Sequence, residues 1–136
     1  MQFQEISEES LQVLVPAFYA RVRRDPDIGP IFEAAIDDWP AHLDKLQAFW
    51  SSVMLGSGRY KGRPLPAHLR HADAITDARF ARWLALWRES TVDLFVPEAA
   101  AALQEKAARI AESLSLGIAF NRDGASGLLD RPSATA

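Results

Sequence analysis

The chain has 136 residues, the length of one domain, with 49% hydrophobic residues and a net charge of −3. It contains no cysteine, which excludes disulfides, thiolate metal sites and cysteine nucleophiles. The negative net charge argues against a nucleic-acid-binding protein with a large basic face. The first ten residues resemble no signal peptide and no apolar run is long enough to span a membrane, so we expect a cytoplasmic protein without a membrane partner.

The first predicted helix begins after Ser7, a suitable N-cap that two glutamates follow. Apolar residues recur at helical spacing between residues 11 and 22. Pro16 interrupts this pattern and should kink the helix or split it in two. Asp25-Pro26-Asp27 ends the helix, and Gly29-Pro30 opens a short turn of helix.

A second long helix is predicted from Asp38, with a wide apolar face. Gly56-Ser57-Gly58 ends it, and residues 56–66 form a loop before a short segment at residues 67–72. A third long helix starts at Thr76-Asp77 and a fourth at Pro97. No segment shows the alternation of a strand, so the predicted fold is all-α, with four longer helices and short connectors.

The folded domain is expected to occupy residues 1–120. Residues 121–136 mix Gly, Ser, Asp and Pro and are predicted to form a disordered tail.

Three histidines are the main candidates for chemistry. His42 lies within the apolar face of the second long helix, where a buried imidazole needs a hydrogen-bond partner or a ligand. On spacing alone, a core histidine bonded to a backbone or side-chain group is the preferred reading. His68 and His71 are three residues apart and could share a helical face as metal ligands, although no HExxH motif accompanies them. No phosphate-binding loop and no Gly-x-Ser-x-Gly motif is present.

Several motifs follow one another in a specific order. They are Phe18-Tyr19, Gly29-Pro30-Ile31-Phe32, His42, Phe49-Trp50, Tyr60-x-Gly62-x-Pro64, Pro66-x-His68-Leu69 and Phe80-x-x-Trp83-Leu84-x-Leu86. This series covers most of the chain and resembles the third group of truncated haemoglobins, small bacterial haem proteins. The absence of a Gly-Gly pair agrees with that group, because the other two truncated groups rely on Gly-Gly corners.

The resemblance implies a truncated globin-like fold, two helices over two, around a haem b pocket. His68 would be the proximal iron ligand, with His71 as a rival one helical turn later. Tyr19, His42 and Trp83 would line the distal side, where a hydroxyl and an indole N–H could donate hydrogen bonds to a diatomic ligand. The other cofactor-binding residues implied are Phe18, Phe32, Leu46, Phe49, Trp50, Tyr60, Arg63, Leu69, Arg70 and Phe80. Tyr60, Arg63 and Arg70 are chosen as propionate partners because they are near His68 in the sequence, and a role as plain surface-loop residues is an equal alternative for them.

The function implied is reversible binding of O₂ or another diatomic ligand. Several distal hydrogen-bond donors favour a redox role in NO or peroxide detoxification, or ligand sensing, over quick release. The chain has no reductase domain, so catalytic turnover would require an external reductase, and whether the protein is an enzyme stays open. The alternative, from a different class, is a cofactor-free helical protein-interaction module.

Overall fold

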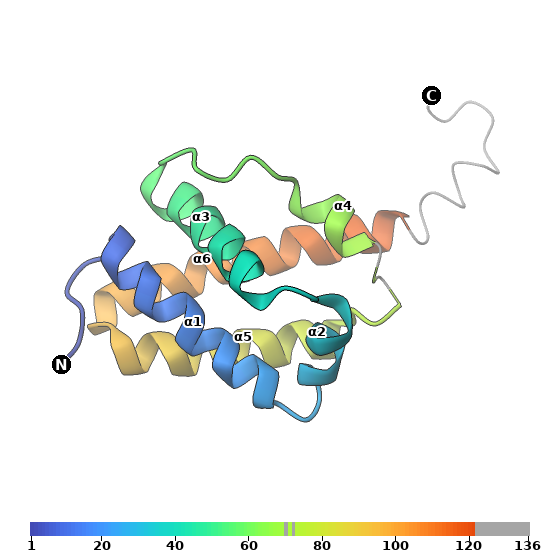
Figure 1. Cartoon of the computed structure of the whole chain (residues 1–136), viewed down its shortest axis with the longest axis horizontal. Coiled ribbons are helices and arrows are strands. Elements are labelled where there is room, and N and C mark those ends of the chain that lie inside the picture. The colour runs from blue at the N-terminus through green and yellow to red at the C-terminus, as the bar shows by residue number, and fades with distance from the viewer. Residues whose placement is uncertain (70, 72, 122–136) are drawn as a thin grey trace.

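The structure is a computed structural model that describes residues 1–69, 71 and 73–121, and it is all-α as predicted (Figure 1). Within these residues it forms the helices α1 (Glu8–Arg24), α2 (Gly29–Ala35), α3 (Trp39–Leu55), α4 (Pro64–Leu69), α5 (Asp77–Leu94) and α6 (Pro97–Ala119). The four long helices form two pairs, α1 with α3 and α5 with α6, and α1 packs on both α3 and α5. No helix in the described part of the chain has the length and apolar character required to cross a membrane.

Local side-chain chemistry sets the ends of the long helices. The amide of Ser10 donates to the Ser7 hydroxyl at 3.1 Å, and the amide of Ser7 donates in return to the Ser10 hydroxyl at 2.8 Å. The Asp38 side chain accepts from the amide of Ala41, the third residue of α3, and the Thr76 side chain accepts from the amide of Arg79, the third residue of α5. Gly56 ends α3 in the left-handed conformation, with φ at 67°, which favours glycine. These contacts confirm the helix boundaries predicted from Ser7, Asp38, Thr76 and Gly56.

Two sequence predictions about helix boundaries are wrong. Pro16 does not split α1, because buried neighbours such as Val15 and Phe18 pack against the core on both sides of the proline. The kink expected there stays a prediction. Helix α4 begins at Pro64 rather than near residue 67, since proline is well suited to the first position of a helix. Residues 70 and 72 and residues 122–136 lie outside the described part of the chain, so the disordered tail stays a prediction.

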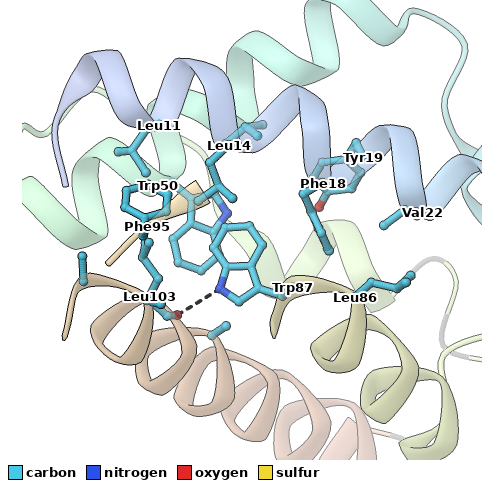
Figure 2. Packing of buried hydrophobic residues seen from close by; sticks show 14 of the residues in the cluster. Leu11, Leu14, Phe18, Tyr19, Val22, Trp50, Leu86, Trp87, Phe95 and Leu103 are labelled. Atoms are coloured by element: carbon cyan, nitrogen blue, oxygen red, sulfur yellow. Dashed lines mark hydrogen bonds between the residues drawn. The ribbon is translucent and has the colours of Figure 1, made fainter. Parts of the chain in front are cut away.

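Trp87 is the centre of the core and is completely buried (Figure 2). Its indole N–H donates to the backbone oxygen of Leu103 at 3.0 Å, so its polar atom is satisfied within the core. Its ring stacks on Trp50 of α3 with centroids 4.3 Å apart, and the edge of Phe18 of α1 meets it at 4.8 Å. This one side chain therefore joins all four long helices.

Helix α3 is much less buried than its apolar sequence suggests. Only Trp39, Trp50 and Ser51 of its 17 residues are buried. Leu43, Leu46 and Phe49, which belong to the same apolar face, are only partly buried. A long apolar face that is partly covered by protein marks the wall of a cavity.

Candidate functional site

A cavity of about 490 Å³ lies against α3, within the range of roughly 300–1,000 Å³ for ligand and cofactor sites. Side chains from every helix line it, and most of them are apolar or aromatic. They are Tyr19, Ile28, Ile31, Phe32, Ala35, Ile36, His42, Lys45, Leu46, Phe49, Trp50, Tyr60, Pro64, His68, His71, Ala74, Ile75, Arg79, Phe80, Trp83, Ile110, Ala111 and Leu114.

His68 lines this cavity with one of its ring nitrogens already engaged. Nδ1 lies 2.7 Å from the backbone oxygen of Pro64, one turn earlier in α4. A carbonyl oxygen can only accept a hydrogen bond, so Nδ1 carries the proton and Nε2 of the neutral ring keeps its lone pair. Metal-binding histidines typically fix the ring orientation and tautomer in this way.

His71 also lines the cavity, but its residue is exposed. Its backbone amide donates to the oxygen of His68 at 2.9 Å, which places it just beyond the end of α4. Among the described residues, a protein hydrogen bond orients the His68 ring and none orients that of His71. The described ranges contain no group of three or more His, Cys, Asp or Glu side chains that could hold a bare metal ion.

Three polar side chains, Tyr19, His42 and Trp83, line the cavity from three other helices. Tyr19 is 4% exposed, and burial raises the pKa of its hydroxyl, an effect that hydrogen bonding with Trp83 partly opposes. Burial, followed by the charges of Lys45 and His68, lowers the pKa of His42. The Tyr19 and His42 rings meet edge to face, 6.2 Å apart. At neutral pH the cavity therefore presents a protonated phenol, an indole N–H and an uncharged imidazole.

The other predicted cofactor-binding residues divide into three groups. Most of them line the cavity: Phe32, Leu46, Phe49, Trp50, Tyr60 and Phe80. Phe18 does not, because it is fully buried between Trp83, at 5.3 Å, and Trp87. Arg63 is exposed on the loop before α4 and lies outside the lining. Arg70 lies outside the described residues, as does the side chain of Leu69.

Two cationic residues of the cavity were not predicted from the sequence, Lys45 and Arg79. Lys45 is three residues after His42 in α3, so the helical spacing could have revealed it. Arg79 is four residues before Trp83 in α5, so the same spacing could have revealed it too. Its guanidinium donates to the backbone oxygen of Ala74 at 2.8 Å and lies 3.6 Å from the Asp27 carboxylate.

Comparison with known proteins identifies the family. No family model matches the chain. Over 115 residues it is 36% identical to the group 3 truncated hemoglobin ctb of Campylobacter jejuni, an alignment that covers 82% of this chain and 90% of that protein. The chain belongs to the group III truncated haemoglobins. The crystal structure of the group III truncated hemoglobin from Campylobacter jejuni superimposes with a TM-score of 0.78 and 35% identity, covering 87% of this chain and 95% of the other.

Membership in the group III truncated haemoglobins confirms the family and the globin-like fold expected from the motifs, and it implies a haem cofactor. The cavity of this truncated haemoglobin fits that cofactor. It offers an apolar lining for the porphyrin, an imidazole in the tautomer that leaves Nε2 to bind iron, and two cations able to pair with carboxylates.

Proposed function

We propose that this truncated haemoglobin holds haem b on Nε2 of His68 and reversibly binds O₂ or another diatomic ligand. The observation that carries the proposal is the hydrogen bond from Nδ1 of His68 to the Pro64 oxygen at the cavity wall. When bound, haem supplies an iron centre that takes up diatomic ligands and exchanges electrons.

Tyr19 and Trp83 act as the hydrogen-bond donors for the ligand. The Tyr19 hydroxyl is a donor at neutral pH, because the ordinary pKa of tyrosine is 10.0 and burial raises the pKa of Tyr19 further. His42 is uncharged and lies beside Tyr19, where it limits the space open to the ligand. Two donors in a buried site retain a polarised ligand, which supports a redox role in NO or peroxide detoxification, or a role in ligand sensing.

The propionate partners we propose are Tyr60, which was already expected from the sequence, together with Lys45 and Arg79, which were not. All three line the cavity, whereas Arg63 does not and Arg70 is not described. An ammonium and a guanidinium can each pair with a carboxylate. Catalytic turnover would draw electrons from an external reductase, and a cytoplasmic location stays a prediction from the sequence.

Adding hemin to the purified protein and recording the Soret region tests the haem assignment. We expect the wild type to shift and sharpen the Soret band of free hemin, His68→Ala to lose this change, and His71→Ala to keep it. Retention of the wild-type spectrum by both variants would show that neither histidine is the iron ligand. A wild type whose added hemin keeps the spectrum of free hemin would favour the cofactor-free interaction module.

The O₂ dissociation rate of the reduced, haem-loaded protein separates redox chemistry or sensing from delivery. Slow release is expected, because two donors face the ligand. Release fast enough for delivery would contradict the redox proposal and leave the haem assignment intact.

A further inference from the structure

We propose that Glu8, in the first turn of α1, is a positioning residue for the cavity. We call Glu8, Ser51, Ser57 and Arg59 together the Glu8 network. Through this network Glu8 holds the loop between α3 and α4. That loop carries Tyr60 into the cavity wall and leads directly to Pro64, whose oxygen orients His68. The role toward His68 rests on the proposed function, whereas the hold on the loop does not.

The two carboxylate oxygens of Glu8 have different partners. One accepts from the hydroxyl of Ser51 in α3, and the other pairs with the guanidinium of Arg59 in the loop. The ion pair is half exposed, with 48% of the Glu8 side chain and 45% of the Arg59 side chain accessible, and on its own contributes little. Ser51 is completely buried, so the hydrogen bond to its hydroxyl is the part that fixes the carboxylate.

The network continues from Ser51 into the loop. The hydroxyls of Ser51 and Ser57 lie 2.6 Å apart, and the Ser57 hydroxyl accepts from the amide of Arg59 at 3.3 Å. The next amide, that of Tyr60, donates to the hydroxyl of Ser52 at 2.7 Å. Two successive serines of α3 and one glutamate of α1 therefore hold three positions of the loop.

The Tyr60 ring is held as firmly as its backbone. It meets the ring of Phe49 edge to face, with centroids 5.2 Å apart. Gly62 lies directly against it, since a Cβ atom at position 62 would come within 2.6 Å of the Tyr60 hydroxyl oxygen. Pro64 begins α4 only two residues later, so a shift of the loop moves the Tyr60 ring and the Pro64 oxygen together.

Amide hydrogen exchange and resonance Raman spectroscopy of the haem-loaded protein test this role, with Glu8→Ala compared to Glu105→Ala. Glu105 is a matched control, because it forms an exposed ion pair with Arg109 inside α6, at 2.9 Å, and takes no part in the loop. In Glu8→Ala we expect exchange at the amides of Arg59 and Tyr60 to rise about three- to tenfold, as for the loss of one buried hydrogen bond. We also expect a shifted iron–histidine stretching frequency and faster transfer of haem to an acceptor globin.

Ser51→Ala should reproduce these changes without removing a charge, and it serves as the second variant if Glu8→Ala fails to fold. Exchange at the two amides equal to that of the control would overturn the proposal. Faster exchange with an unchanged iron–histidine frequency and unchanged haem transfer would also overturn it, since Glu8 would then stabilise the loop without positioning the site. If the wild type shows no iron–histidine band, the proposed function fails, and amide exchange alone decides whether Glu8 holds the loop.

Discussion

Burial controls the protonation of the residues expected to meet the ligand. Tyr19 loses contact with water, so its pKa rises and its hydroxyl stays protonated. His42 is partly buried beside Lys45, so its pKa falls and its ring stays neutral. At neutral pH Tyr19 is uncharged in any case, and the lowered pKa of His42 keeps its imidazole uncharged as well. Tyr19 and His42 therefore add no charge of their own beside the ligand, and the cations of the cavity are Lys45 and Arg79.

Tyr19→Phe should speed O₂ release by about 10- to 100-fold, the effect of losing roughly 1.4–2.7 kcal/mol of hydrogen bonding. The substitution removes only the hydroxyl and leaves the ring contacts with Phe18 and Phe32. Stopped-flow measurement of O₂ dissociation checks this. An unchanged rate would mean that Tyr19 makes no hydrogen bond to the ligand.

Lys45→Gln should raise the pKa of His42, because it removes a positive charge that disfavours the imidazolium. NMR titration of the ring of His42 in the diamagnetic carbon monoxide form measures the change. Lys61→Gln is the control, since Lys61 is not among the causes of the shift. A pKa of His42 that rises equally in both variants, or in neither, would contradict a direct effect of Lys45.

The sequence motifs led to some site residues and not to others. The family pattern pointed to Tyr19, His42, His68 and Trp83, which line one cavity in the structure. Periodicity shows that a residue faces inward, but it cannot show whether the inside is a packed core or a cavity. The resemblance placed Phe18 at the cofactor, although it belongs to the core. Lys45 and Arg79 were missed, although they lie three residues from His42 and four from Trp83, respectively.

At the scale of single elements, local chemistry predicted the helix starts, because an N-cap depends on residues three apart in sequence. The continuity of α1 through Pro16 was not predictable in this way. It depends on buried contacts with three other helices, which outweigh the missing hydrogen bond of a proline. The corner between α1 and α2 combines local hydrogen bonds with a contact to a distant helix, since both are made by one buried carboxylate.

Asp25 forms that corner. Its side chain is 2% exposed and accepts from the amides of Asp27 and Ile28, both at 3.0 Å, and from Arg82 of α5 at 2.7 Å. The hydrogen bond from Ile28 is the main reason that its pKa lies below the ordinary 3.8, with burial acting against it and Arg82 adding to it. The charged form is therefore the one that stabilises the fold.

Asp25→Ala should lower the free energy of unfolding at pH 7 by about 1–3 kcal/mol. Because the folded-state pKa is depressed, this contribution is complete above 3.8 and is lost as the pH falls through the folded-state value. Urea unfolding of wild type and variant between pH 7 and pH 3 should show a difference that shrinks in acid. Glu33→Ala, which removes an exposed ion pair with Arg23, should change stability by less than about 0.5 kcal/mol. A difference for Asp25 that grows in acid would contradict the account.

At the scale of the whole molecule, the apolar residues serve two purposes. One set packs around Trp87 into a core without solvent contact, and the other lines a cavity with partly buried side chains. Eleven Trp and Phe residues are many for a small helical core, and the division explains them. A cofactor that binds only the folded state should then stabilise the protein through the second set.

Leu103→Ala and Leu46→Ala separate these two sets. Leu103 is fully buried, and we expect Leu103→Ala to lower the free energy of unfolding by about 2–4 kcal/mol with or without haem. Leu46 lines the cavity, so without haem Leu46→Ala should lower the free energy of unfolding by less than Leu103→Ala does. With haem, Leu46→Ala should mainly reduce the stabilisation that haem adds. Urea unfolding with and without added haem measures both. Equal losses in the absence of haem would mean that Leu46 belongs to a closed core.

The central claim is that Nε2 of His68 binds the iron, and rescue of a His68→Gly variant by free imidazole tests it most directly. The account predicts that haem-loaded His68→Gly loses the wild-type Soret spectrum and regains it when imidazole is added, because imidazole can occupy the space the ring leaves. A His68→Gly spectrum identical to that of the wild type, and unaffected by imidazole, would contradict it.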